Sequence, residues 1–397
     1  MSAFARRPLD PELDIPASGG WRPGDPPAWR KFMQVCDGRC FALEGGGQLD
    51  QITLAYETWG TLDAAASNAI LVCHALTGDA HAAGPSGPGQ RQEGWWNDLI
   101  GPGRALDTDR YFIVCANVLG GCQGSTGPMS PHPEDGRPYG ARFPVVSTRD
   151  IVRTQALLAD GLGIDRWLSV VGGSMGGMQV LEWAVMYPDR LASFVSMAST
   201  AAASPLQVGW SQAGRLAIVQ DPRWNGGDYY DAAPGEGPHQ GLMLARRIAQ
   251  IHYRSDKSFQ DRFDRATVNP LAEFRMWDRF QIESYLDYHG QKLARRFDAN
   301  SYLLLNKVMD LHDVGRGRGG IRSALGRVTA PSLVVTIDSD TLYTPRQQEA
   351  LVDDLRAGGA DVDYVVVNSD HGHDGFLLEF EQLAPLLGDF LSEQAKS

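Results

Sequence analysis

The sequence has few cysteines, a shortage of positive charge and no long apolar run. Its five cysteines are spread along 397 residues without C-x-x-C spacing, which argues against a disulfide framework and against a structural zinc site. Lysine and arginine number 36 against 48 acidic residues, and the formal net charge of −12 argues against binding to nucleic acid or to an anionic membrane. We therefore expect no metal, no nucleic acid and no membrane as partners.

Signals for export and for membrane insertion are also missing from the sequence. The first ten residues contain no apolar stretch of the kind that a signal peptide needs. No run approaches the roughly 18 apolar residues that a membrane-spanning helix requires. These absences predict a cytoplasmic protein.

What the chain does contain is an alternation of short apolar runs with helical patterns. Seven runs rich in β-branched residues are strand candidates, at 52–56, 69–73, 111–115, 168–171, 194–197, 332–337 and 362–367. Helical patterns at 148–162 and 175–186 lie between them, and the second ends before Pro188, as expected before a proline. The alternation predicts a mainly parallel sheet with helices on both faces.

The order of these patterns predicts how the chain is divided. Residues 1–30 contain several prolines and glycines and no periodic apolar pattern, so we expect an arm over the surface. Strand patterns stop from 204 to 326 and helical ones replace them, which predicts a helical cap inserted into an α/β core formed by 31–203 and 327–397. Active sites commonly lie between such a cap and the carboxyl edge of the sheet.

The most informative motif is Gly-Gly-Ser-Met-Gly-Gly at 172–177, which follows a strand candidate and opens a helical pattern. This is the setting of a G-x-S-x-G nucleophile elbow, with Ser174 as the nucleophile. Such a turn strains the backbone of the serine, and glycine neighbours avoid clashes that a Cβ atom would cause. A plain Gly-rich turn capped by serine is the alternative, whereas a phosphate loop would need a G-x-x-x-x-G-K-[ST] pattern that the sequence lacks.

An elbow serine needs a base and an acid, which follow it along the chain in the order Asp, His in this fold. The strand candidate at 332–337 is followed by Asp338 and Asp340, and the one at 362–367 is followed by His371 and His373. Spacing alone does not choose within either pair. The two histidines could also form a metal pair, but no third ligand of clear spacing is present.

The oxyanion hole in this fold takes one N–H from the residue after the nucleophile and another from a loop after an earlier strand. The first residue is Met175. The strand candidate at 69–73 is followed by His-Ala-Leu-Thr-Gly at 74–78, where many esterases have an HGG-type loop.

Taken together, these residues resemble the homoserine O-acetyltransferase family, from about residue 40 to 392. The resembling segments are Cys-His-Ala-Leu-Thr-Gly at 73–78, Trp-Trp at 95–96 with Gly-Pro-Gly at 101–103, Gly-Gly-Cys-Gln-Gly-Ser-Thr-Gly-Pro at 120–128, the elbow at 172–182, Arg-Phe-Asp-Ala-Asn at 296–300 and Gly-His-Asp at 372–374. No generic hydrolase motif shares this set. The resemblance implies an α/β-hydrolase fold with a helical cap.

The resemblance also implies roles for particular residues. The acid of the family lies in a Ser-Asp-x-Leu-Tyr pattern, which corresponds to Asp340, and the base lies in Gly-His-Asp, which corresponds to His373. The oxyanion donors correspond to the backbone N–H groups of Leu76 and Met175.

Two charged residues correspond to the substrate-binding pair of the family, Arg246 and Asp374. An amino acid needs a cation for its carboxylate and an anion for its ammonium group, so the pair makes chemical sense. Without the resemblance, Arg246 would be interpreted as a helical surface arginine.

The implied reaction moves an acetyl group from acetyl-CoA to the hydroxyl of L-homoserine through an acyl-enzyme on Ser174. Its product, O-acetyl-L-homoserine, is used for methionine synthesis, and no tightly bound cofactor is implied. Members of the family that use succinyl-CoA or serine, and small-ester hydrolases, remain alternatives. The resemblance further implies a homodimer formed through the helical insertion.

Two other features are open to a second interpretation. Gly-Arg-Gly-Arg-Gly-Gly at 315–320 resembles an RNA-binding segment, but a single short copy in an acidic protein is more typical of a loop between helices. A binding module that has lost catalysis would usually lack one member of the triad, and all three are present. The role of Cys122, in a Gly-rich loop, stays open.

Overall fold

An eight-stranded sheet forms the centre of the computed structural model, which describes residues 15–269 and 277–396. In spatial order its strands are β1 (Lys31–Ala42), β2 (Gln48–Trp59), β6 (Phe112–Ala116), β3 (Ala69–Cys73), β7 (Ser169–Gly173), β8 (Phe194–Met197), β9 (Ser332–Ile337) and β10 (Val362–Val367). The neighbours from β6 to β10 pair in parallel, whereas β1 and β2 are antiparallel. The mainly parallel sheet is confirmed, and each of the predicted runs overlaps one of its strands.

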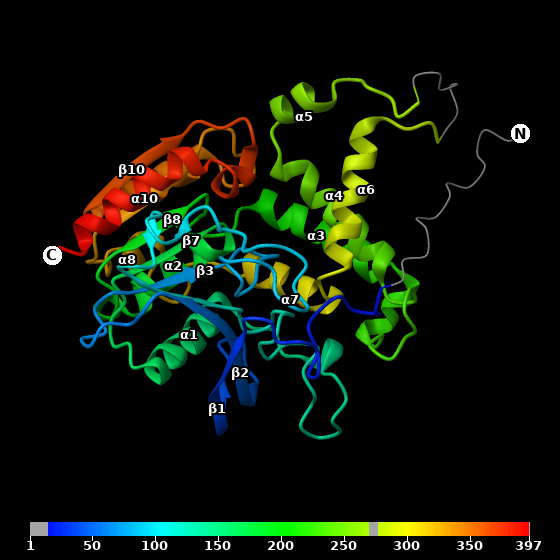
Figure 1. Ribbon diagram of the computed structural model, residues 1–397, viewed down its shortest axis with the longest axis horizontal. Coiled ribbons are helices and arrows are strands. Elements are labelled where there is room, and N and C mark those ends of the chain that lie inside the picture. Colours follow the sequence, from blue (N-terminus) through cyan, green and yellow to red (C-terminus); the bar gives the residue numbers. More distant parts are fainter. Residues whose placement is uncertain (1–14, 270–276, 397) are drawn as a thin grey trace, which may run out of the picture.

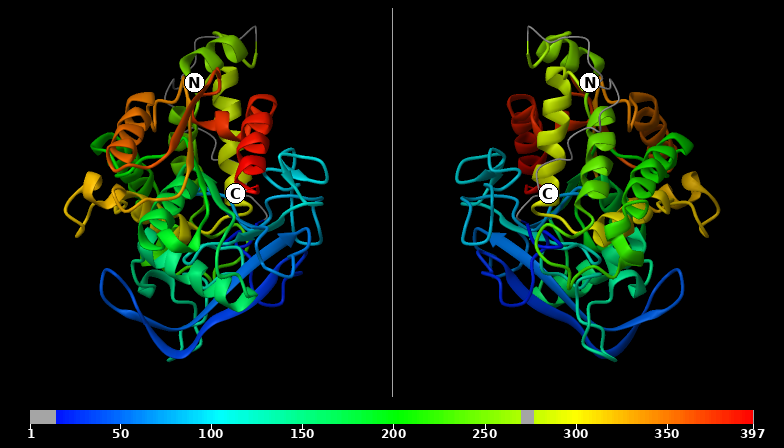
Figure 2. Two further views of the ribbon diagram at one scale, coloured as in Figure 1. Left: turned by 90° about the vertical axis from the view of Figure 1, so that its left-hand side faces the viewer. Right: turned by 90° about the vertical axis from the view of Figure 1, so that its right-hand side faces the viewer.

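Strand β1 was not predicted from the sequence. It pairs with β2 in a long hairpin that projects beyond the rest of the sheet (Figure 2). A second, two-stranded sheet of β4 (Ile100–Gly101) and β5 (Leu106–Asp107) lies in the chain between β3 and β6.

The parallel strands are buried on both faces, which explains their continuous apolar runs. Successive side chains of a strand point to opposite faces, so the sheet separates two cores. In β3, Leu71 belongs to the larger core, whereas Ile70 and Val72 belong to the core on the other face. The larger core includes residues of α1 (Thr148–Leu162), α2 (Met175–Met186) and α9 (Pro345–Ala357), and the other includes α10 (Phe380–Gln394).

Local sequence explains where two of these helices begin and end. Helix α1 starts at a capping box in which Ser147 and Asp150 exchange hydrogen bonds, and it ends at Gly163 with a left-handed backbone. Helix α2 ends before Tyr187 and the short 3-10 helix η2 (Pro188–Arg190). Both helices have the bounds predicted from the sequence. Further 3-10 helices are η1 (Gly140–Arg142) and η4 (Gly372–Leu377).

Between β8 and β9 the chain forms a set of helices. These are α3 (Pro205–Val219), the 3-10 helix η3 (Pro222–Gly227), α4 (His239–Tyr253), α5 (Asp256–Phe263), α6 (Gln281–Ala294), α7 (Ala299–Asp310) and α8 (Ile321–Leu325). Figure 1 shows α3, α4 and α6 gathered at one end of the molecule, away from β10 and α10. The exact division into core and cap, at 204 and 326, remains a prediction. No helix within residues 15–269 and 277–396 is long and apolar enough to cross a membrane.

The predicted arm is described from residue 15 onward, and residues 1–14 lie outside the described part. The arm is attached by hydrogen bonds: Ser18 Oγ donates to Asp298 Oδ1 at 2.8 Å, and the Gly19 N–H donates to the Phe297 carbonyl at 3.2 Å. The Trp21 N–H donates to the Cys122 carbonyl at 2.8 Å. This part of the arm therefore lies where the helical insertion meets the core.

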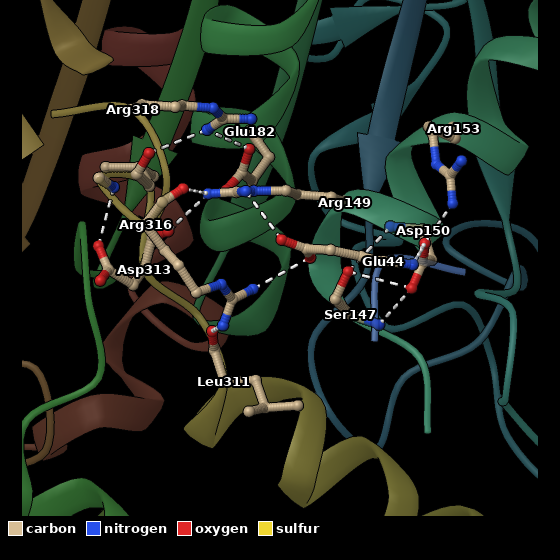
Figure 3. Close-up of polar contacts among 12 residues, drawn as sticks. Glu44, Ser147, Arg149, Asp150, Arg153, Glu182, Leu311, Asp313, Arg316 and Arg318 are labelled. Atoms are coloured by element: carbon tan, nitrogen blue, oxygen red, sulfur yellow. Dashed lines mark hydrogen bonds and ion pairs between the residues drawn. The ribbon is translucent and has the colours of Figure 1, made fainter. Parts of the chain in front are cut away.

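The Arg-containing segment at 315–320 is a loop between α7 and α8, as predicted. It belongs to a buried network of charges centred on Glu182 of α2 (Figure 3). Glu182 pairs with Arg149 Nε at 3.1 Å and with Arg318 Nη1 at 2.8 Å. Burial raises the pKa of Glu182 and the two arginines oppose this rise. The network ties α2, the helix that Ser174 caps, to the segment that returns from the insertion.

Replacement of Glu182 should therefore be costly to stability. We expect Glu182→Ala to lower the free energy of unfolding by about 3–5 kcal/mol, because Arg149 and Arg318 would remain buried without their shared anion. The control is Glu44→Ala, which removes a more exposed carboxylate that also pairs with Arg149; its cost should be about 0–1 kcal/mol. Urea denaturation of the three proteins measures both values, and equal losses would contradict the central place of Glu182.

Candidate active site

Ser174 occupies a sharp turn between β7 and α2. Its backbone has φ 58° and ψ −125°, a conformation that is unfavourable for a residue with a Cβ atom. Small neighbours make the turn possible: a Cβ atom at Gly176 would lie 2.1 Å from the carbonyl oxygen of Cys73, and one at Gly172 would lie 2.7 Å from the backbone of Gly176. The turn has the geometry of a nucleophile elbow.

A chain of hydrogen bonds joins three buried side chains from separate elements. His373 Nε2 lies 2.9 Å from Ser174 Oγ, and His373 Nδ1 lies 2.8 Å from Asp340 Oδ2. Since a carboxylate only accepts, Nδ1 carries the proton and the Nε2 lone pair faces the serine hydroxyl. Asp340 Oδ1 is held by the backbone N–H groups of Leu342 at 2.8 Å and Tyr343 at 3.0 Å. The arrangement can activate a serine for attack on an acyl group.

The competing candidates, Asp338 and His371, lie outside this chain. Asp338 Oδ1 accepts a hydrogen bond from the Ser369 N–H at 2.9 Å, and His371 Nδ1 accepts one from Arg254 Nη1 at 3.1 Å. No cluster of three or more potential metal ligands occurs in the described parts of the chain. The geometry favours Asp340 over Asp338, while the roles themselves stay predictions.

The two predicted oxyanion donors come from separate segments of the chain near Ser174. Met175 is the first residue of α2, so its N–H has no acceptor within the helix. Leu76 follows β3 and lines the same small cavity as Ser174. Two N–H groups from these positions could hold an oxyanion that forms on an acyl group attached to the serine.

A histidine that the sequence reasoning did not select fixes the loop of Leu76. The buried His74 donates from Nδ1 to the Ala75 carbonyl at 2.8 Å, and its Nε2 accepts from the Val118 N–H at 3.1 Å. Burial lowers the pKa of His74, which favours the neutral ring that these two hydrogen bonds require. Because the Ala75 carbonyl and the Leu76 N–H belong to one peptide plane, His74 orients that N–H.

A small cavity of about 30 Å³ lies beside Ser174. Its walls come from α3, α4 and α7 of the insertion as well as from the core; they include Leu76, Met178, Gln207, Trp210, Ala245, His252, Tyr302, Met309, Asp310 and Leu342. The insertion thus covers the serine and separates it from bulk water.

Two tyrosines that the sequence reasoning did not select flank the histidine. The rings of Tyr253 and Tyr343 lie 5.7 and 5.1 Å from the His373 ring, and burial raises the pKa of both phenols. A sequence signal existed for each: Tyr343 ends the Ser-Asp-x-Leu-Tyr pattern, and Tyr253 follows Arg246 by two turns on one face of α4.

The two residues of the predicted substrate-binding pair, Arg246 and Asp374, have different kinds of neighbour. The guanidinium of Arg246 lies 5.3 Å from the centre of the Tyr253 ring and forms no ion pair with a described residue. Asp374 Oδ2 lies 3.2 Å from Arg254 Nε, so this carboxylate already has a cationic neighbour. Arg254 was not foreseen, because nothing in the local sequence connects it with Asp374.

A larger cleft, of about 430 Å³, borders the site on the side of Arg246. It is lined by the arm, by the segment from Ala75 to Trp95, and by residues of α4 and α6. Ala75 and Thr77 line the cleft while Leu76 lines the small cavity, so the oxyanion loop separates the two spaces.

The open question of Cys122 is answered in part by its surroundings. The thiol is buried, and burial raises its pKa to about 12. A thiol that stays protonated is a poor nucleophile. Cys122 is therefore suited to packing and not to chemistry in this site.

Comparisons with known proteins agree with the fold. A family model described as alpha/beta hydrolase fold matches residues 68–380. The chain is 52% identical over 382 residues to the homoserine O-acetyltransferase of Thermobifida fusca, which covers 96% of this chain and 98% of the relative. The crystal structure of homoserine O-acetyltransferase from Bacillus anthracis is 28% identical, with a TM-score of 0.84, and covers 91% of this chain and 97% of that one. Esterase E22 is also 28% identical, with a TM-score of 0.83 over 91% of this chain and 99% of its own. The predicted α/β-hydrolase fold is confirmed.

Substitution of Asp340 and of Asp338 should have sharply different effects on the rate of acylation. We expect Asp340→Asn to slow acylation of the protein by roughly 10³–10⁴-fold, because an amide would no longer hold His373 in the productive tautomer. The matched change Asp338→Asn should alter it by less than about tenfold, since Asp338 bonds only a backbone N–H near the site. The burst of 4-nitrophenolate from 4-nitrophenyl acetate measures acylation, and the reverse order would show that the wrong carboxylate was chosen.

Proposed function

Because the chain belongs to the homoserine O-acetyltransferase family of α/β hydrolases, we propose that it transfers an acetyl group from acetyl-CoA to the hydroxyl of L-homoserine. The product is O-acetyl-L-homoserine, an intermediate for methionine synthesis. The observation that carries the proposal is the hydrogen-bonded chain from Ser174 through His373 to Asp340 beneath the helical insertion. The reaction has two halves that share this chain.

In the first half, Ser174 Oγ attacks the thioester carbonyl while His373 Nε2 takes the hydroxyl proton. The carbonyl oxygen becomes an oxyanion, which the N–H groups of Leu76 and Met175 are positioned to receive. Collapse of this intermediate breaks the carbon–sulfur bond, and the proton on His373 passes to the leaving thiolate. Ser174 is left acetylated and CoA is released.

In the second half, the homoserine hydroxyl attacks the acetylated serine. His373 Nε2 accepts the hydroxyl proton and then returns it to Ser174 Oγ as the ester bond to the serine breaks. Asp340 stays ionised throughout and stabilises the imidazolium form that exists between the two proton transfers.

The acceptor proposal depends on Arg246 and Asp374. Arg246 can bind the homoserine carboxylate with two parallel hydrogen bonds, which its lack of an anionic neighbour within the described chain leaves possible. Asp374 meets Arg254 through Oδ2, and its other oxygen can accept from the ammonium group. Asp374 follows His373 directly, so an ammonium held there would bring the hydroxyl near the base.

The small cavity supports acetyl over succinyl as the transferred group. Its volume of about 30 Å³ has room for roughly two water molecules, which suits a methyl group better than a four-carbon chain. Asp310 also lines it and pairs with Arg215 at 2.6 Å. The free carboxylate of a succinyl group would meet no unpaired cation among the described residues here, because Arg215 is already engaged by Asp310.

Hydrolysis of small esters is the second candidate function, because esterase E22 shares the fold at comparable similarity. The two functions differ in whether water or an amino acid attacks the acyl-enzyme. The walls of α3, α4 and α7 around Ser174 favour a bound acceptor over water. Equal release of free thiol from acetyl-CoA with and without homoserine would favour the hydrolase.

The assembly and location of the protein are part of the proposal. Apolar side chains on α3 and α4 are exposed to solvent, among them Leu206, Leu216, Leu244 and Ile251. Such a group suits burial against a second copy, in keeping with a homodimer formed through the insertion. A cytoplasmic location remains the expectation drawn from the sequence.

The nucleophile is tested by Ser174→Ala. We expect this change to lower acetyl transfer by roughly 10³-fold or more, since Ser174 Oγ is the hydroxyl hydrogen-bonded to His373 Nε2. Mass spectrometry of the intact wild-type protein after brief exposure to acetyl-CoA should show one added acetyl group, and the variant should show none. Transfer retained above about a tenth of the wild-type rate would remove Ser174 from this role.

The acceptor site is tested by Arg246→Ala. We expect kcat/KM for homoserine to fall by an amount equivalent to roughly 2–5 kcal/mol, because the carboxylate would lose its partner in a partly buried site. The burst of CoA from acylation of Ser174 should persist, since that half does not involve homoserine. As a control, 3-aminopropan-1-ol lacks the carboxylate and should react at similar rates with both proteins. A burst lost together with transfer would indicate a structural or CoA-binding arginine.

A further inference from the structure

We propose that the larger cleft binds the phosphate groups of the CoA-type donor, with Lys292 and Arg295 at the end of α6 as phosphate ligands. The inference rests on the proposed function, because it concerns where the donor of that reaction is held. It goes further by giving the phosphates a site outside the small cavity and separate from the residues proposed for homoserine.

The position of the cleft suits a long donor molecule. The oxyanion loop forms its boundary with the small cavity, and Leu377 of η4, the element that also contains His373, lines it too. A CoA thioester has its phosphates at one end and its reactive carbonyl at the other, joined by a flexible arm. Phosphates in the cleft would allow that arm to pass the loop and reach Ser174.

The cleft is basic although the protein as a whole is acidic. Six basic side chains and three carboxylates line it: Arg30, Arg91, Arg246, Lys292, Arg295 and Arg296 against Asp25, Asp79 and Glu93. The chain as a whole carries a formal charge of −12. A local excess of cations in an acidic protein indicates a site for an anionic ligand.

Some cations of the cleft have a partner within the part of the protein that the structure describes and others do not. Arg296 pairs with Asp79 at 2.6 Å, and Arg30 donates to Gln123 Oε1 at 2.8 Å. By contrast, Lys292 and Arg295 form no side-chain hydrogen bond or ion pair with any residue in 15–269 or 277–396. Both are only partly exposed. They are available to a ligand without the loss of an existing contact.

Lys292 shows the excess of positive charge most clearly. Burial lowers the pKa of its ammonium group, and Arg296 and Arg246 lower it further. A phosphate beside Lys292 would be stabilised by all three cations at once. The single carboxylate of homoserine needs only Arg246. Homoserine therefore has no anionic group for the remaining cations of the cleft.

A second, independent feature of the cleft also indicates a ligand. His81 lines it, is buried, and directs Nδ1 to Glu57 Oε2 at 2.8 Å. Its other ring nitrogen, Nε2, is buried and has no hydrogen-bond partner within the described parts of the chain. Because Nδ1 is engaged by Glu57, Nε2 is the ring nitrogen of His81 that remains, at the wall of the cleft, without a partner among the described residues.

The direct test measures binding of CoA itself, without turnover. The variants are Lys292→Gln and Arg295→Gln, with Lys307→Gln as a matched control, because Lys307 is an exposed lysine of α7 outside the cleft. We expect calorimetry to give a CoA Kd about tenfold higher in each cleft variant and unchanged in the control. The wild-type Kd should also rise as salt is added. Unchanged CoA binding in both cleft variants would overturn the proposal.

A comparison of donors separates a phosphate site from a structural effect. S-acetyl-N-acetylcysteamine has the thioester but no phosphate. We expect Lys292→Gln to lower kcat/KM for acetyl-CoA about tenfold and to change kcat/KM for the phosphate-free donor by less than about twofold. Equal losses with both donors would contradict a phosphate site.

The two proposals can fail separately. A wild-type protein that binds CoA through the cleft cations but forms no acyl-enzyme would contradict the proposed function and leave the cleft as a phosphate site. A protein that acetylates homoserine, and whose CoA binding is unchanged by both substitutions, would contradict the cleft proposal and leave the proposed function standing. Succinyl-CoA serves as a further ligand in these binding tests, because its phosphates are the same as those of acetyl-CoA and only its acyl group differs.

Discussion

The strained backbone of one residue sets the conditions for the rest of the site. Ser174 can adopt φ 58° only because a parallel strand ends and a helix begins at that residue, with glycines where any Cβ would meet the backbone. The central position of β7 in the sheet holds both elements in place. Everything else in the site is arranged around this fixed hydroxyl: the imidazole from η4, the carboxylate after β9, and the loop after β3.

Charge in this protein is organised by pairing. Within the core, Glu182 pairs with two arginines, and at the oxyanion loop Arg296 pairs with Asp79. Ions that are paired in this way hold segments together but have little left to offer a ligand. The cations of the cleft that lack such partners are therefore the chemically available ones, and they line a cleft that the loop of Leu76 separates from Ser174.

Much of the fold could be predicted because its signals are local. Buried parallel strands need continuous apolar runs, and α1 carries its own start and stop signals in Ser147 and Gly163. Strand β1 was missed because it is largely exposed and its register is set by β2. Asp338 and Asp340 both follow β9, so spacing could not separate them; the difference is that Asp340 contacts His373, whereas Asp338 accepts from the Ser369 N–H. The pairing of Arg254 with Asp374 joins elements far apart in the chain and left no local signal.

The order of the site residues along the chain has a consequence for synthesis on the ribosome. Ser174 precedes the helical insertion, whereas Asp340 and His373 follow it. Segments nearer the N-terminus are made first and can begin to fold first. A growing chain that has not yet reached Asp340 and His373 thus has Ser174 and the helices that cover it, but lacks the two side chains proposed to activate the serine. In the proposed mechanism, acylation of Ser174 becomes possible only once these later segments have been synthesised and folded.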